Sequence, residues 1–167
     1  MTAVSTKDFH NIHEEIITFL PEDRDYWSFI DYIASQAEIR EYKSLTDTIA
    51  KKLFLYKFWL RRGPEVFNEY IERVKYADEH FSHLREKGRY TDMGRIYIKY
   101  GKPDQEMKLP QEGPYMPCVR WQYFTGGLFF IFVDRMNTGK YELMYTNANG
   151  ENVNPNWQRY INPQALE

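Results

Sequence analysis

The chain has a single cysteine, Cys118, among its 167 residues. One thiol excludes a disulfide within the chain, and it also excludes a zinc site built from several thiolates. Cys118 lies between Pro117 and Val119, where alternating residues predict the start of a strand. We therefore expect a buried, inert thiol rather than a nucleophile.

Positive and negative side chains are nearly balanced in number. The chain carries 22 basic and 24 acidic side chains, which gives a net charge of −2. Proteins that bind nucleic acid usually show a basic surplus or stripe, so no nucleic-acid partner is expected. No apolar run approaches the roughly 20 residues of a membrane-spanning helix. We therefore expect no transmembrane segment, and we recognise no signal peptide in this chain.

Aromatic residues, by contrast, are abundant. They make up 17% of the chain, with 14 Tyr, 11 Phe and 4 Trp, and hydrophobic residues as a whole make up 43%. This is the composition of a globular domain with its own core. Tyrosine and tryptophan suit both a core and a recognition surface, because each joins a large apolar ring to a polar group.

Apolar residues recur at helical spacing through the first half of the chain. They predict helices over 7–20, 21–35, 35–43, 46–62 and from Pro64 to Gly88. Ser35 and Glu38 form a capping-box pattern, and Pro64 suits the first residue of a helix. In the helix over 46–62 the expected inward residues are Ile49, Leu53, Leu60 and either Phe54 or Tyr56. In the last helix they are Phe67, Tyr70, Val74, Ala77, Phe81 and Leu84.

After Gly94 the period changes to alternation. Ile96, Ile98 and Tyr100 alternate with more polar residues and predict a strand, whereas 105–117 holds three prolines and a glycine and is expected to be mostly loop. Short turns join three further predicted strands, over 119–124, 128–133 and 141–146, and the apolar run at 128–133 should be buried on both faces. The expected fold class is α+β, with N-terminal helices packed with a C-terminal antiparallel β-meander of about four strands.

This pattern predicts three regions. Residues 1–30 are an N-terminal helical extension, 31–146 form the α+β domain, and 147–167 form a C-terminal tail. In the tail, Trp157, Tyr160 and Ile161 are expected to dock as a last helical turn. The final two residues, Leu166 and Glu167, are interpreted as a tag remnant.

Asp92 and Arg95 form the most notable polar pair, three residues apart across a glycine. One interpretation is that they are a charge pair lining a cleft. The favoured one is structural: Thr91 and Asp92 bond nearby backbone N–H groups, and Arg95 ties the sheet edge to the helix.

Catalytic and metal-binding signatures are weak. His10 with His13, and His80 with His83, are three apart and could share helix faces, but a metal site needs three or four ligands in place. The turn over 137–140 lacks the leading glycine and following helix of a phosphate loop, and no nucleophile-elbow serine occurs. We predict no catalytic residue, no metal site and no cofactor.

The segment GRYTDMGRIYIKYGKPD, residues 88–104, resembles the signature of the GWxTD domain family. The matching positions are Gly88, Thr91, Asp92, Gly94, Arg95, Ile96, Tyr97, Ile98, Tyr100, Gly101, Pro103 and Asp104. Further blocks extend the likeness over about residues 31–146. Two positions depart: Arg89 stands where the family has tryptophan, and Gly63 interrupts its Arg-Asp-Pro block.

The resemblance implies a bacterial domain, often part of a larger exported protein, so a periplasmic or cell-envelope location is implied too. It brings no established activity. The candidate motif or binding residues are Gly88, Thr91, Asp92, Arg95, Tyr97, Gly101 and Asp104.

Two functions follow as hypotheses. The first is a non-catalytic interaction or structural module that docks another protein, or another domain of the parent chain. It would do so through the tyrosines of an aromatic sheet face (Tyr97, Tyr123, Tyr141 and Tyr145), an edge strand or the 105–117 loop. The alternative is a small-ligand-binding or hydrolytic domain with Asp92, Arg95 and Asp104 in one cleft.

Overall fold

The computed structural model describes residues 30–167. The predicted helix over 7–20, most of the predicted segment over 21–35, and the pair His10 and His13 lie outside these residues. The chain divides into two compact units, the first reaching Glu72 and the second beginning at Arg73. Within the described part of the chain, no helix is long and apolar enough to cross a membrane.

The first unit contains α2 (Gln36–Ser44), α3 (Thr48–Arg62) and the start of α4 (Pro64–His80). The capping box at Ser35 is confirmed, because its side chain accepts a hydrogen bond from Glu38 N–H while the Glu38 carboxylate accepts one from Ser35 N–H. Asp47 caps α3 in a similar way, through Ala50 N–H. The two helices predicted over 35–43 and 46–62 are therefore present.

The inward face predicted for α3 is wrong at three positions, since Ile49, Leu53 and Leu60 are exposed. Of the two alternatives Phe54 and Tyr56, Phe54 is buried, together with Leu55, Phe58 and Trp59. Two apolar stripes compete on this helix, and the one with the larger aromatic area is buried. Its rings continue a chain of contacts, with centroids 5.0–6.3 Å apart, that also includes Tyr42, Phe67 and Tyr70.

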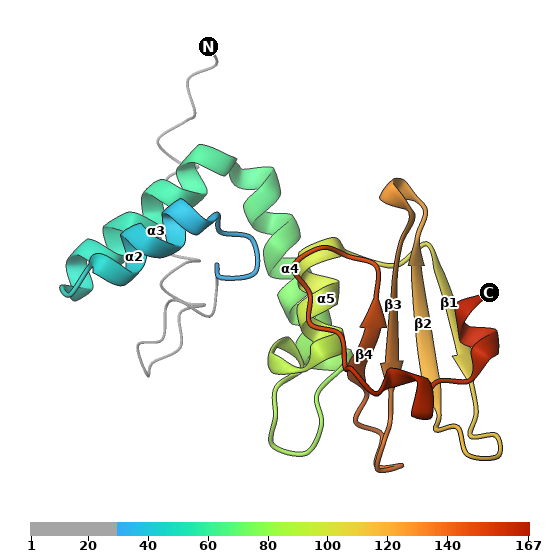
Figure 1. Cartoon of the computed structure of the whole chain (residues 1–167). Helices are drawn as coiled ribbons and strands as arrows, with labels where there is room; N and C mark the ends of the chain where they lie inside the picture. The colour runs from blue at the N-terminus through green and yellow to red at the C-terminus, as the bar shows by residue number, and fades with distance from the viewer. Residues whose placement is uncertain (1–29) are drawn as a thin grey trace. The chain divides into compact units, whose positions relative to one another are not determined.

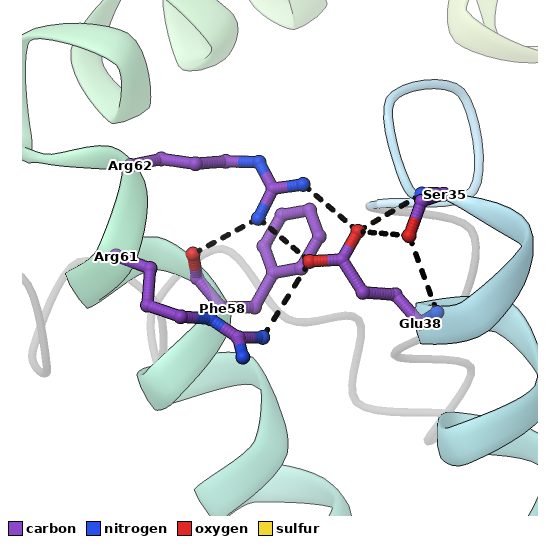
Figure 2. A network of polar contacts seen from close by, with 5 residues as sticks. All are labelled: Ser35, Glu38, Phe58, Arg61 and Arg62. Atoms are coloured by element: carbon purple, nitrogen blue, oxygen red, sulfur yellow. Dashed lines mark hydrogen bonds and ion pairs between the residues drawn. The ribbon is translucent and has the colours of Figure 1, made fainter.

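Glu38 joins α2 to the end of α3 in a network drawn in Figure 2. Its carboxylate accepts hydrogen bonds from Arg62, at 2.9 and 3.0 Å, and forms a longer contact of 3.5 Å with Arg61. The Arg62 guanidinium also lies 3.5 Å above the Phe58 ring. The hydrogen bond from Arg62 outweighs partial burial and lowers the pKa of Glu38 from 4.5 to about 2.

Replacing Glu38 by Gln is expected to destabilise this unit by about 2 kcal/mol, because hydrogen bonds to charged groups contribute about 1.5–3 kcal/mol. Since the folded-state pKa is depressed, the stabilisation is complete above pH 4.5 and is lost as the pH falls towards 2. Helix melting followed by circular dichroism across this range is the measurement. Glu41→Gln, on the exposed surface of the same helix, is the control. Equal acid sensitivity of Glu38→Gln and the parent chain would contradict the prediction.

The helix predicted from Pro64 ends earlier than expected. Phe67, Tyr70, Val74 and Ala77 are buried as predicted, but α4 stops at His80 rather than near Gly88. Leu84 lies in the turn that follows, with a positive φ of 53° and 93% of its surface exposed. The Ser82 hydroxyl donates to the Asp78 carbonyl near the end of the helix.

The strand predicted after Gly94 is also wrong, because residues 92–100 form helix α5 (Asp92–Tyr100). Alternating Ile96, Ile98 and Tyr100 satisfy a strand pattern, but a nine-residue segment is short enough to satisfy either period. The capping residues at the two ends of the segment favour the helix over the strand. The Thr91 side chain accepts from Gly94 N–H as an N-cap, and Gly101 ends the helix at φ 83°.

The sheet has four antiparallel strands in the order β1 (Gln105–Leu109), β2 (Cys118–Tyr123), β3 (Leu128–Val133) and β4 (Glu142–Thr146) (Figure 1). The α+β class and the meander of the last three strands are confirmed. The first strand is not the predicted one, since β1 lies in the segment predicted to be mostly loop. As expected, β3 is a central strand, with four consecutive buried residues.

Both faces of the sheet are covered. One face packs on α5 and the residues after α4, through a core centred on Trp121, Phe130 and Phe132. The other face is covered by the chain after β4, whose Ile161 and Ala165 are buried against Cys118 and neighbouring strand residues. Trp157 and Ile161 dock as predicted, and Cys118 is buried, which raises the pKa of its thiol. The strand tyrosines therefore do not form an open aromatic face.

Candidate functional site

Gly88 and Gly94 mark a place where three pieces of backbone pass very close together. A Cβ atom at Gly88 would lie 1.7 Å from the carbonyl oxygen of Ala77, and one at Gly94 would lie 1.8 Å from the carbonyl oxygen of Gly88. Neither glycine has a positive φ. Both positions therefore require glycine for space and not for backbone freedom.

Thr91 fixes the passage from this crossing into α5. Its buried hydroxyl donates to the Gly88 carbonyl at 2.7 Å and accepts from Gly94 N–H at 3.1 Å. One side chain thus ties the short helical turn at Gly88–Tyr90 to the first turn of α5. The hydroxyl thus both donates and accepts in this structural role.

Asp92 and Arg95 connect α5 to the chain around β4. The Asp92 carboxylate accepts from Leu143 N–H at 2.8 Å, and it lies 3.7 Å from the Arg95 guanidinium. Arg95 donates to Glu151 at 2.6 Å, and Lys99 reaches the other Glu151 oxygen at 2.7 Å. Both side chains have structural contacts, but the backbone group that Asp92 bonds belongs to a distant strand and not to the nearby turn that was predicted.

Tyr97, Gly101 and Asp104 belong to the other end of α5. Tyr97 is buried and stacks on Tyr76 with ring centroids 4.4 Å apart. The Gly101 carbonyl accepts from the Tyr123 hydroxyl at 2.8 Å, and the Asp104 carboxylate accepts from Phe124 N–H at 2.7 Å. Tyr97 therefore packs α5 on α4, while Gly101 and Asp104 secure the end of the helix to the β2–β3 hairpin.

The structure therefore brings Gly88, Thr91, Asp92 and Arg95 together, but it places Asp104 elsewhere. Asp92 lies at the start of α5 and Asp104 beyond its end, and a nine-residue helix is about 13 Å long. The cleft hypothesised for Asp92, Arg95 and Asp104 has no basis in this geometry.

Arg89, which stands where the resemblance expects tryptophan, has a structural role of its own. Its backbone N–H donates to one Asp78 oxygen at 2.9 Å, and its guanidinium binds the other through Nε at 2.8 Å and through Nη2. The substitution therefore replaces an aromatic side chain by an ion pair that holds the turn against α4.

A first cavity of about 300 Å³ lies beside the start of α5, on the α5 face of the sheet. Phe81, Met93, Val119 and Tyr141 supply its apolar wall, and Glu106, Lys108 and Lys140 supply charge. Both lysines are paired, Lys108 with Glu106 at 3.0 Å and Lys140 with Glu86 at 2.6 Å. Each carboxylate raises the pKa of its lysine, so both stay cationic near neutral pH.

A second cavity, of about 330 Å³, lies on the opposite face of the same two strands. It is lined by Gln105, Met107, Arg120, Gln122, Phe124 and Glu167. Successive residues of a strand point to opposite faces. The β1 residues Glu106 and Lys108 accordingly line the first cavity, while Gln105 and Met107 line the second.

The two edges of the sheet differ. The outer side of β4 is covered by the chain itself, because Leu143 N–H donates to Asp92 and the Met144 carbonyl accepts from Asn154 N–H at 3.0 Å. Among the described residues, β1 has a strand partner on one side only, namely β2 (Figure 1). Its other side is the open edge of the sheet.

The backbone groups that face this open edge belong to Glu106 and Lys108. Asp134 N–H donates to the Pro117 carbonyl, in continuation of the β2–β3 register. Along a central strand, successive residues form their backbone hydrogen bonds first with one neighbouring strand and then with the other. Cys118, Arg120 and Gln122 therefore bond towards β1, where their partners are Leu109, Met107 and Gln105. The two β1 residues in between point their N–H and C=O groups outwards.

β1 was not predicted from the sequence, although a signal was present. Glu106 and Lys108 alternate with Met107 and Leu109, which is a strand pattern. Pro110, Pro114 and Pro117, with Gly113, favoured a loop interpretation of the whole 105–117 segment. Proline is compatible with the boundaries of an edge strand, because an edge strand is bonded on one side only.

The described residues contain no group of three or more potential metal ligands. His80 stacks on the Tyr76 ring at 3.8 Å, and its Nδ1 lies 3.0 Å from the Tyr76 carbonyl. Its stacking belongs to the aromatic packing at the end of α4.

A family model described as the GWxTD domain matches residues 15–163, nearly the whole chain. The match extends on both sides of the predicted 31–146 region and takes in most of the chain that covers the second face of the sheet. No curated protein and no solved structure matches the chain.

Proposed function

The chain belongs to the GWxTD domain family, and we propose that its second unit is a non-catalytic interaction module that binds an extended protein segment along the outer edge of β1. The segment would come from another protein or from another domain of the parent chain. One observation carries the proposal: the fold covers the edge at β4 with its own side chain and backbone groups, but leaves the edge at β1 open.

Strand addition explains why cavities flank this edge. An added strand gains affinity from main-chain hydrogen bonds and selectivity from pockets that receive alternate side chains. At β1 the outward backbone groups of Glu106 and Lys108 supply the hydrogen bonds. The two cavities lie on opposite faces of β1, so successive side chains of the partner would face one cavity and then the other.

The cavities differ in chemistry, and this difference supplies selectivity. The first presents two lysines and a glutamate beside Phe81, Met93 and Tyr141, so it suits a charged side chain. The second presents Met107 and Phe124 beside Arg120, so it suits an apolar one. Phe124 is two-thirds exposed and would lose that exposure under a partner.

The signature supports a scaffold role rather than a catalytic one. Thr91, Asp92, Arg95 and Asp104 each hold a backbone group or an ion pair of the fold, and of the four only Thr91 lines either of the two cavities described above. Such a module fits the larger, envelope-associated bacterial proteins that the family resemblance implies.

Peptide selection with a matched pair of edge variants tests the proposal. Ten-residue peptides selected from a random library on the full chain should shift the amide resonances of 105–109 and of both cavity linings. Lys108→Pro removes one outward N–H without touching the bonds to β2 and is expected to weaken binding at least tenfold. Lys108→Ala keeps that N–H and serves as control. Peptides that perturb residues away from β1, or that bind Lys108→Pro unchanged, would refute the proposal.

A further inference from the structure

The open edge of β1 is complementary to itself, and we infer that a second copy of this chain docks there. This inference rests on the proposed function and names its partner. Two β1 strands would pair antiparallel about a two-fold axis at Met107, which joins the two four-stranded sheets into one. An interface of this kind is isologous, because the same patch serves both copies.

The charges of β1 select this register. With Met107 opposite Met107 of the second copy, each Glu106 lies opposite the other copy's Lys108. Opposite charges directly across an antiparallel pair are favourable, and like charges are unfavourable. Within one chain Glu106 and Lys108 already lie 3.0 Å apart on the same face of the strand. The dimer would therefore hold four charges in alternation, two of each sign.

The backbone supports the same register independently. Glu106 and Lys108 are the two β1 residues whose N–H and C=O groups point outwards, and the two-fold axis at Met107 pairs each with the other. Residues that exchange both hydrogen bonds face each other directly in an antiparallel ladder. The pairing thus satisfies the outward groups of both strands at once.

The opposite face adds apolar contact. Met107 is half-buried on this face and lies beside Phe124 in the lining of the second cavity. At the two-fold axis the two methionines form a non-hydrogen-bonded pair, the closer kind of cross-strand neighbour. Methionine adapts to such contacts because its thioether is flexible and polarizable.

The expected dimer is weak and depends on concentration. One pair of five-residue strands is a short contact, and interfaces below about 1,200 Å² belong to transient complexes. Sedimentation velocity of the full chain over a concentration series reaching roughly 1 mM, the millimolar end of the affinity scale, is the measurement. A monomer across the whole series would overturn the inference.

Charge exchange tests the register itself. Lys108→Glu places glutamates opposite each other, Glu106→Lys places lysines opposite each other, and each variant alone is expected to dimerise at least tenfold more weakly. An equimolar mixture of the two should form a heterodimer, because every pair is again of opposite sign. The double variant Glu106→Lys/Lys108→Glu should self-associate like the parent chain, and it also controls for loss of the hydrogen bond from Trp121 to Glu106.

The outcomes separate this inference from the proposed function. A monomeric chain whose β1 still binds selected peptides would overturn the second copy as partner and leave the interaction module standing. A dimer insensitive to Lys108→Pro and to both single charge reversals would place self-association on another surface and overturn the inference. Failure of both dimerisation and peptide binding at β1 would remove both proposals.

Discussion

Replacing Gly94 by alanine is expected to lower the free energy of unfolding of the second unit by about 3 kcal/mol or more. The added Cβ would sit 1.8 Å from the Gly88 carbonyl oxygen, which is a backbone atom and cannot rotate away. Relief requires α5 to move from the turn that Thr91 ties to it, and overpacking of this kind costs about 1–3 kcal/mol or more. Loss of the capping hydrogen bond at Thr91 would add about 1 kcal/mol.

Gly88→Ala is expected to be comparably destabilising, since its Cβ would lie 1.7 Å from the Ala77 carbonyl oxygen in α4. Guanidinium unfolding followed by tryptophan fluorescence, to which buried Trp121 of the second unit contributes, measures both variants. Gly113→Asn is the control, because no atom lies within 4 Å of a Cβ there and asparagine tolerates its φ of 54°. That change should stay within about 0.5 kcal/mol. Stability near that of the parent chain for Gly94→Ala would show that the backbone crossing is not as tight as described.

The second large effect is expected at Glu151, whose side chain is only 3% exposed between Arg95 and Lys99. Replacing it by glutamine removes the charge that both cations contact. Breaking a fully buried ion pair costs about 3–5 kcal/mol. The two cations keep 26% and 33% of their exposure, so water compensates them in part. The expected loss is therefore smaller, about 2–3 kcal/mol.

The ion pairs of Glu151 also make the stability of the second unit depend on pH. Burial by itself would raise the pKa of Glu151, but the bonds from Lys99 and Arg95 outweigh it and hold the pKa below 4.5. The resulting stability is present above pH 4.5 and is lost as the pH falls through the lowered value. Burial opposes the charged form of Lys99, but the contacts with Glu151 outweigh it and raise the pKa of Lys99 above 10.5. The stabilisation from Lys99 is therefore present below pH 10.5 and is lost as the pH rises through the raised pKa.

Unfolding free energies from acid to alkaline pH test this expectation. Glu151→Gln should lower the free energy of unfolding near neutral pH. It should also weaken the fall of that free energy at acid and at alkaline pH. Glu142→Gln, which removes the partner of Arg135 in an exposed pair, should change stability by at most about 1 kcal/mol. If both variants lost the same small amount, Glu151 would not be the link between α5 and the chain after β4.

Local chemistry along the chain was readable from the sequence. Ser35 with Glu38 identified the start of α2, and Pro64 identified the start of α4, because caps depend on residues within one turn. The strands over 128–133 and around 119–124 were readable because their apolar runs end at glycine turns. The signature around Thr91 was readable as a tightly bonded turn, since threonine and aspartate bond to nearby backbone groups.

The failures share a physical cause. Ile96, Ile98 and Tyr100 fit a strand as well as a helix, so α5 was decided by caps at Thr91 and Gly101 and by packing on the sheet. On α3 two apolar stripes were available, and the face that is buried depended on aromatic partners elsewhere in the unit. The prolines and the glycine after Leu109 indicated a loop, and β1 was decided by its pairing with β2.

The sequence by itself determined the α+β class, the family and the starts of α2 and α4, because each depends on neighbouring residues or on hydrophobic period. Only the tertiary structure decided that Asp92 covers the edge at β4, that Asp104 lies away from it, and that β1 is left open between two cavities. The strands pair in sequence order, but the contact that covers the β4 edge joins Leu143 to Asp92, which lies before β1 in the chain, and no local pattern encodes which edge remains free.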